Sequence, residues 1–307
     1  MRTDDWRTSD NIEDRRDDGD GGYGGGGFGM PVGAGGLGIG GLVVLGLLGW
    51  ALGIDPRVLI GAGDVLTRQS PYQQQAPIQR RPSSKTSQPT DISGKFVGQV
   101  LAANEDRWRE MFQASNRRFE APRLVLFRGR TSSACGLAQS AMGPFYCPSD
   151  KKIYLDTSFF ADLERRFRGC EGSACKFSQA YVIAHEYGHH VQNLLGILPS
   201  VQQKQHAMAK TEANRLQVKV ELQADCLAGV WANRQQQKTP FLEPGDVEAA
   251  LKTAAAIGDD RLQRQSRGVV MPDSFTHGAS EQRVRWFNTG FKSGTVDSCN
   301  TFAAANL

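Results

Sequence analysis

The sequence contains no CxxC pair, and no cysteine occurs before residue 135. The common thiolate zinc sites and thioredoxin-type redox centres depend on such pairs, so neither is expected. The chain also lacks a dense run of lysine and arginine interleaved with aromatic residues, the pattern typical of nucleic-acid-binding proteins. No internal repeat is visible. We therefore expect no nucleic-acid partner and no zinc site built on cysteine.

Hydrophobic residues are scarce, at 39% of the 307 residues, whereas glycine is frequent, with 35 residues. This composition predicts a folded part diluted by segments that do not fold. Residues 1–30 contain four arginines and eight acidic residues, a net charge of −4, so the rest of the chain must carry +8 to give the total of +4. The acidic start passes into "GDGGYGGGGFGM", which cannot bury a core. We predict that residues 1–31 are disordered.

Residues 32–54 are all apolar or glycine, and no charged residue occurs between positions 21 and 54. About 20 helical residues, each rising ~1.5 Å, cross the ~30 Å hydrocarbon core of a bilayer. We predict a single transmembrane helix over residues 32–54, with a glycine-rich buried segment as the alternative. No small-residue cleavage site follows, which favours an uncleaved anchor over a signal peptide. Gly49 and Gly53 have the small-xxx-small spacing that allows a weak homodimer through this helix.

Residues 55–93 become rich in Gln, Pro and Ser, a composition typical of a flexible tether. The folded domain is therefore expected over residues 94–307. Positive charges on the two sides of the predicted span balance, so they do not fix its orientation. The cysteines indicate the orientation of the span, because disulfides form outside the cytoplasm. We expect a single-pass protein of the bacterial inner (plasma) membrane whose domain faces the periplasm.

Six cysteines confined to one region predict up to three disulfides, and buried free thiols in a cytosolic protein are the alternative. The third and fourth are close enough in sequence to pair locally, and the first and second flank a predicted turn. The remaining two pair by elimination, although six cysteines allow 15 connectivities. The expected pairs are Cys135–Cys147, Cys170–Cys175 and Cys226–Cys299.

The hydrophobic pattern of the domain predicts an α+β fold that is mostly helical, with a small sheet. Short β-type runs predict strands over residues 123–127 and 152–156. Helices are expected over about 96–112, 157–168, 178–195 and 212–236, in a stretch that begins near Pro244, and in "ASEQRVRWFNTGF".

Residues 185–189 read HEYGH within a predicted helix. His185 and His189 then project from one face about one turn apart and can bind one ion from the same side. Glu186, one step round, can reach a water on that ion rather than the ion itself. This HExxH arrangement indicates zinc when its context is helical. His190 projects about 100° away from His189 and is interpreted as structural, and the isolated His206 as solvated.

A third ligand must come from elsewhere, because catalytic zinc takes three protein ligands and His₂Glu is an established set. Glu221 lies 32 positions after His189, on another predicted helix. Asp225 shares its face and can accept the proton from the other nitrogen of a ligand histidine. This helix is largely apolar, so its carboxylates need partners. Two alternatives stay open: Asp225 is the ligand and Glu221 is secondary, or both acids lie on a wet helix face.

The chain resembles the bacterial neutral zinc metallopeptidases, a group of membrane-anchored predicted metalloproteases, over about residues 94–302. The matching stretches, in order, are "GRTSSACG", "GPFYCPSDKKIYLD", "AHEYGHHVQ", "ELQADCLAGVW" and "HGASEQRVRWFNTG". The resemblance implies a zincin-like fold. It also implies one zinc ion per chain, bound by His185, His189 and Glu221, with Glu186 as general base.

"ELQAD" is also similar to the glutamate-ligand motif of the CAAX prenyl proteases and their bacterial heat-shock relatives. Those proteins carry a later His–Pro…Arg element, and "THGASEQRV" is similar to it, with Gly278 in place of proline. This analogy implies that His277 donates to the oxyanion and that Arg283 braces the site. A loop or helix-cap histidine is the alternative for His277.

These patterns predict a membrane-anchored zinc metalloendopeptidase that hydrolyses a peptide or protein substrate with Glu186 as general base. An extended substrate could pair with a strand edge, which we place in "FYCPSDKKIYLD". Two alternatives remain. One is a membrane-tethered binding or chaperone-like protein on a zincin scaffold with little turnover, and the other is a zinc hydrolase acting on a non-peptide bond.

Overall fold

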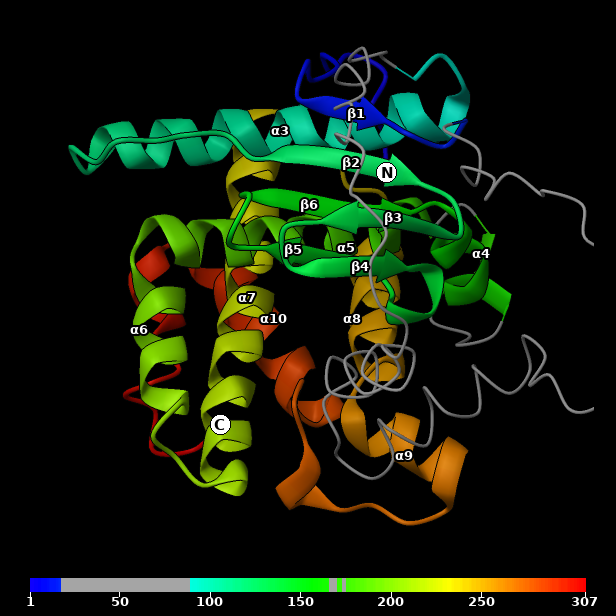
Figure 1. The fold of residues 1–307 in the computed structure, drawn as a ribbon. Helices are drawn as coiled ribbons and strands as arrows, with labels where there is room; N and C mark the ends of the chain where they lie inside the picture. Colours follow the sequence, from blue (N-terminus) through cyan, green and yellow to red (C-terminus); the bar gives the residue numbers. More distant parts are fainter. Residues whose placement is uncertain (18–88, 166–169, 173–174) are drawn as a thin grey trace, which may run out of the picture. The chain divides into compact units, whose positions relative to one another are not determined.

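The computed structural model describes residues 1–17, 89–165, 170–172 and 175–307. Helices make up most of this part of the chain, and a four-stranded sheet and a two-stranded hairpin accompany them. Most of the helices, α6 to α10, lie below the sheet in the view of Figure 1. The expected α+β class, mostly helical with a small sheet, is confirmed.

The four-stranded sheet has the strand order β1-β2-β6-β5. Its first three strands run parallel, and β5 pairs antiparallel with β6 at the edge. The central strands β2 and β6 occur where the sequence predicted strands, and nearly all their residues are buried, as expected of strands covered on both faces. The strands of the sheet are β1 (Ile12–Asp14), β2 (Arg123–Phe127), β5 (Phe145–Cys147) and β6 (Lys152–Asp156), and the hairpin is β3 (Arg130–Ser133) with β4 (Gly136–Gln139).

The prediction of disorder over residues 1–31 is wrong for residues 1–17. This segment supplies β1, and the Trp6 ring packs against those of Trp231 and Phe241. A short strand added to an existing sheet edge needs few apolar residues of its own, so its composition alone does not reveal it. The remaining residues to 31, the span expected over 32–54 and nearly all of the expected tether lie outside the described residues.

None of the described helices is long and apolar enough to cross a membrane. The helices are α3 (Ile92–Ala114), α4 (Ser158–Arg165), α5 (Cys175–Leu194), α6 (Ile197–Gln205), α7 (Lys210–Lys238), α8 (Asp246–Ala256), α9 (Asp259–Arg267) and α10 (Ser280–Ser293). Helix α6 was not among the expected helices, because Gly196 and Pro199 are residue types that usually end a helix. Gly196 instead turns the chain with a φ of 76°, and Pro199 occupies the first turn of α6, where the missing N–H leaves no helical bond unmade.

Glycines allow the central helices to approach closely. A Cβ added at Gly290 of α10 would lie 1.9 Å from the carbonyl oxygen of Cys226 in α7. A Cβ added at Gly188 of α5 would lie 3.0 Å from the carbonyl oxygen of Ala224, also in α7. Since α7 touches both neighbours along its buried middle, side chains from all three helices can meet there.

The cysteines are joined in the three pairs expected from the sequence. The Sγ–Sγ distances are 2.07 Å for Cys135–Cys147, 2.15 Å for Cys170–Cys175 and 2.02 Å for Cys226–Cys299. The last pair joins α7 to the segment that follows α10, 73 residues further along the chain. This crosslink therefore fixes the C-terminal segment beside the helix that carries both acids of the expected site.

Candidate metal centre

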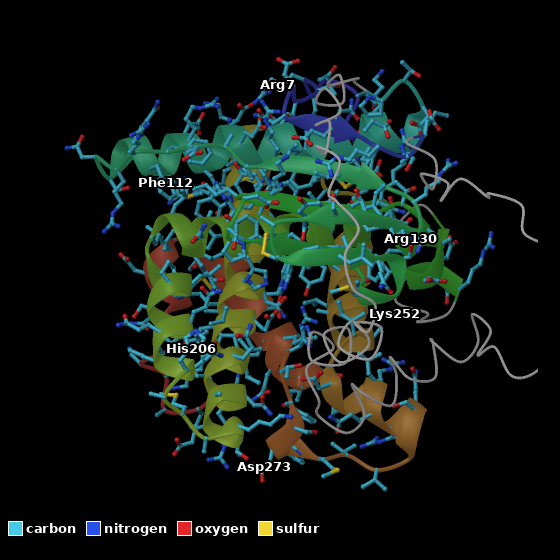
Figure 2. All side chains as sticks on the ribbon, viewed as in Figure 1. Arg7, Phe112, Arg130, His206, Lys252 and Asp273 are labelled. Carbon is cyan, nitrogen blue, oxygen red and sulfur yellow. A yellow bond between two sulfur atoms is a disulfide. The ribbon has the colours of Figure 1, made fainter. Side chains whose placement is uncertain are left out.

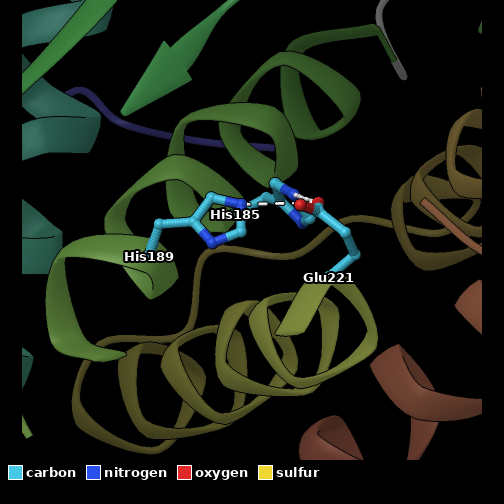
Figure 3. A group of neighbouring side chains, drawn as sticks. All are labelled: His185, His189 and Glu221. Atoms are coloured by element: carbon cyan, nitrogen blue, oxygen red, sulfur yellow. Dashed lines mark hydrogen bonds and ion pairs between the residues drawn. The ribbon is translucent and has the colours of Figure 1, made fainter. Parts of the chain in front are cut away.

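Three side chains from two helices converge on one point. Helix α5 places His185 and His189 one turn apart, and α7 places Glu221 opposite them (Figure 3). The Oε2 atom of Glu221 lies 3.3 Å from Nε2 of His185 and 3.4 Å from Nε2 of His189. One possible ligand atom from each residue lies within 4.8 Å of the other two. The three residues could therefore hold a metal ion.

The spacing and donor types suit zinc. Ligand atoms about 2.0–2.2 Å from a tetrahedral zinc ion lie roughly 3.3–3.6 Å from one another. The two measured separations from Glu221 Oε2 agree with this geometry. Two imidazoles and one carboxylate are also a ligand set found in catalytic zinc sites, which keep the fourth position for water.

Asp225 supports His185 rather than serving as a ligand. Its Oδ1 accepts a hydrogen bond from Nδ1 of His185 at 2.8 Å, so this nitrogen keeps its proton and Nε2 is left for a metal. The same carboxylate accepts bonds from Tyr181 Oη at 2.6 Å and from Arg283 at 2.8 and 2.9 Å. Because Asp225 is fully buried and both its oxygens are occupied, the geometry favours Glu221 as the third ligand.

Gln192 plays the equivalent role for His189, which the sequence interpretation did not foresee. Its side-chain nitrogen donates to the carbonyl oxygen of Val220 at 2.8 Å and to Oε1 of Gln223 at 2.9 Å. Its Oε1 lies 2.9 Å from Nδ1 of His189 and can only accept there. His189 therefore carries its proton on Nδ1 and offers Nε2 to a metal. The position of Gln192, three residues after His189 on the same helix, is the signal that could have revealed it.

Glu221 has a supporting bond of its own. Gln217, one turn earlier on α7, donates to its Oε1 at 2.8 Å and leaves Oε2 facing the two histidines. Burial alone would raise the pKa of Glu221, but the charge of His189 and hydrogen bonds with His189 and His185 hold it well below its usual value; the charge of His277 lowers this pKa further. The Glu221 carboxylate is therefore ionised at neutral pH.

The charges around His189 favour a cation. Burial lowers its pKa, but the charge of Glu221, their hydrogen bond and the charge of Glu186 outweigh it and raise the pKa to about 9. Glu186 itself is buried, and among the described residues its carboxylate has no hydrogen-bond partner. A carboxylate that follows His185 directly on α5 and makes no such bond is available to a water molecule.

His190 and His206 do not belong to the group of side chains that could hold a metal ion. His190 is enclosed: its Nδ1 lies 3.0 Å from Tyr146 Oη and its Nε2 lies 2.7 Å from the Glu120 carbonyl oxygen. Burial lowers the pKa of His190 to about 4, so the ring is neutral at physiological pH. His206 is exposed at the end of α6 (Figure 2). Both placements agree with the structural and solvated roles expected for them.

His277 lies in the loop before α10 and is clamped by a residue that the sequence interpretation missed. Oδ2 of the buried Asp259 accepts backbone N–H bonds from Thr276, His277 and Gly278 at 2.7, 2.6 and 3.1 Å. Its Oδ1 lies 3.5 Å from Nδ1 of His277. Gly278 has a φ of 93°, which proline cannot adopt, so this loop differs in backbone from the His–Pro element to which it was compared. Asp259 could not be predicted from a residue pattern, because its partners are backbone amides.

A family model described as "Putative neutral zinc metallopeptidase" matches residues 1–302. The chain belongs to this family. An uncharacterized protein of Escherichia coli strain K12, YpfJ, is 48% identical over 304 residues, which cover 98% of this chain and 99% of that protein. Another, Rv2575 of Mycobacterium tuberculosis strain H37Rv, is 45% identical over 198 residues, 62% of this chain and 65% of that protein. No solved structure matches this chain.

Proposed function

We propose that this protein is a zinc-dependent endopeptidase that cleaves peptide bonds with Glu186 as general base. The observation that carries the proposal is the convergence of His185, His189 and Glu221, with the unbonded carboxylate of Glu186 on the same helix as the two histidines. In this proposal His185, His189 and Glu221 are the zinc ligands, as expected from the sequence. One zinc ion per chain is proposed.

The chemistry follows from the positions of the protein's own groups. Zinc, when bound, supplies a Lewis acid that lowers the pKa of water to about 7 and polarises a carbonyl group. Glu186 accepts the proton of the attacking water and returns it to the leaving amine. His277 donates a hydrogen bond to the oxygen that becomes negative in the transition state. Asp225 and Gln192 hold the ligand imidazoles through their Nδ1–H groups.

An extended substrate can be bound along β5. This strand ends the sheet order and lies within the stretch from which the sequence predicted an edge strand. Tyr146 of β5 reaches His190 of α5, next to the ligand His189, so the edge is close to the helix that carries the site. Main-chain hydrogen bonds along such an edge bind a peptide with little regard to its sequence.

We also propose that the domain functions outside the cytoplasm, in the periplasm. Three disulfides join all six cysteines, and such bonds persist in oxidising compartments. Attachment to the inner membrane through residues 32–54 remains part of the proposal, as does weak association of two copies there. The substrate is a peptide or protein.

The test compares the full-length protein with its Glu186→Gln variant, both purified in detergent. Zinc content is measured first, and cleavage of a peptide library and of a denatured protein is measured next. We expect one zinc per chain in both proteins and cleavage by the wild type alone. Zinc without Glu186-dependent cleavage would favour the binding or chaperone-like alternative. Glu186-dependent hydrolysis of esters but not of peptides would favour a non-peptide substrate, and loss of zinc from the wild type would refute the site.

A further inference from the structure

Residues 1–17 are part of the folded domain, not an appendage. Besides the pairing of β1 with β2, the backbone N–H of Leu124 donates to the Asn11 carbonyl oxygen at 2.8 Å, and that of Ser9 donates to the Gly98 carbonyl oxygen at 3.1 Å. Residues 1–17 and the domain that follows residue 84 form one compact unit. The family match, which begins at residue 1, covers this segment too.

The buried carboxylate of Glu105 in α3 shows how far the domain depends on this segment. Glu105 is 2% exposed, and it accepts hydrogen bonds from Ser9 Oγ at 2.5 Å, Asn11 Nδ2 at 2.8 Å and Arg7 Nη2 at 2.8 Å. All three donors belong to the N-terminal segment. Without it, Glu105 would be left as a charge on α3 without these partners, a strongly unfavourable state if the carboxylate stayed buried.

Steric fit and charge pairing also show that the N-terminal segment packs against α3. A Cβ added at Gly98 of α3 would lie 2.5 Å from Cγ2 of Thr8, so the glycine makes room for the segment. Arg7, on the upper surface in Figure 2, also binds Asp106 through Nη2 at 2.7 Å. Ile12 of β1 is 1% exposed and belongs to the main hydrophobic core.

We propose that residues 1–17 and 89–307 lie on the same side of the membrane, an inference that rests on the membrane attachment proposed above. A single crossing would separate the two parts by about 30 Å of hydrocarbon. None of the contacts described above could then form.

Two single-cysteine additions test the sidedness in the full-length protein. Asp5→Cys reports on the N-terminal segment and Lys292→Cys on the domain, and both positions are exposed. A membrane-impermeant maleimide is added to spheroplasts and, in parallel, to lysed cells. We expect both thiols to react in the same preparation. Reaction of one in spheroplasts and of the other only after lysis would overturn the proposal.

A second measurement tests the packing itself. Ile12→Cys should react at least tenfold more slowly than Asp5→Cys in the native protein and equally fast after denaturation, because Ile12 is buried. If Ile12→Cys does not fold, Ser9→Cys repeats the test. The Ser9 side chain is fully buried, and this substitution replaces only its oxygen atom with sulfur. Native reactivity equal to that of Asp5→Cys at both positions would overturn the proposal.

The outcome is separable from that of the proposed function. If Asp5→Cys and Lys292→Cys both react only after lysis, the shared side is supported and the periplasmic location is refuted. Neither measurement depends on zinc or on peptide hydrolysis.

Discussion

Arg283 should contribute more to stability than an ordinary surface arginine, because it neutralises a fully buried carboxylate. Arg283 is 2% exposed and Asp225 is 0% exposed, and two hydrogen bonds of 2.8 and 2.9 Å join them. Arg283→Met keeps much of the side-chain volume but leaves the charge of Asp225 buried without its cation. Breaking such a pair costs about 3–5 kcal/mol, and we expect the free energy of unfolding to fall by that amount. Because Asp225 also holds His185, zinc affinity should fall roughly 10–100-fold.

The chain offers a matched control. Arg215 forms an ion pair with Asp273 at 3.0 Å, but these side chains are 67% and 72% exposed. Water and salt screen such a pair, so Arg215→Met should change the free energy of unfolding by no more than about 0.5 kcal/mol. Urea denaturation of the metal-free proteins gives both values. Chelator competition gives the zinc affinities.

The double variant Arg283→Met/Asp225→Asn separates the unpaired charge from lost packing. Since it leaves no charge buried at this position, it should recover part of the stability lost in Arg283→Met, although not the support of His185. If Arg283→Met costs no more than Arg215→Met, the reasoning about the buried pair is refuted. If the double variant is less stable than Arg283→Met, the loss comes from packing rather than from charge.

Three further predictions concern Gln192, His190 and the disulfide between Cys226 and Cys299. Gln192→Met should weaken zinc binding roughly 10–100-fold in chelator competition, because no acceptor then holds the proton on Nδ1 of His189. His190 has a pKa of about 4 when folded and about 6.5 when unfolded, so the unfolded state takes up the proton first as pH falls. Urea denaturation should therefore show a loss of about 3 kcal/mol between pH 6.5 and 4, which His190→Gln removes. Replacing Cys226 and Cys299 with alanine should lower the free energy of unfolding by about 4 kcal/mol, because their disulfide spans 73 residues.

Each of these predictions has a control. Gln223→Met removes one of the two acceptors for the Gln192 side-chain nitrogen but leaves the acceptor for His189, so its zinc affinity should fall less than that of Gln192→Met. Equal affinities for Gln192→Met and the wild type would contradict the first prediction. Identical pH profiles with and without the histidine would contradict the second. The third is contradicted if the five-residue disulfide Cys170–Cys175, with an expected contribution of about 2 kcal/mol, proves the more stabilising.

Sequence spacing could predict the parts of the site that lie on one helix. His185 and His189 face the same way because four residues make about one helical turn, and the same holds for Glu221 and Asp225. The meeting of the two helices could not be derived from spacing, because it depends on how closely α5 and α7 pack. Gly188 permits that approach, but the sequence does not show which helix packs against a given glycine.

Contacts distant in sequence and without a periodic pattern escaped prediction. Arg283 was assigned its bracing role only through a resemblance, since 58 residues separate it from Asp225. Asp259 was missed because its partners are backbone N–H groups, which every residue except proline can offer. The N-terminal segment was missed because strand pairing and the burial of Glu105 depend on partners about 95–110 residues away, whereas composition describes only the segment itself.

A continuous series of hydrogen bonds connects His189 with Cys299, one half of the disulfide Cys226–Cys299. His189 contacts Gln192, Gln192 contacts Gln223, and the Gln223 side-chain nitrogen donates to the Cys299 carbonyl oxygen at 2.9 Å. The disulfide from Cys299 to α7 holds that carbonyl in place. Without it, the last acceptor in the series is free to move, and the Gln192 oxygen that fixes His189 loses part of its support. We therefore expect the variant in which alanine replaces Cys226 and Cys299 to bind zinc more weakly than the wild type, as well as to unfold more easily.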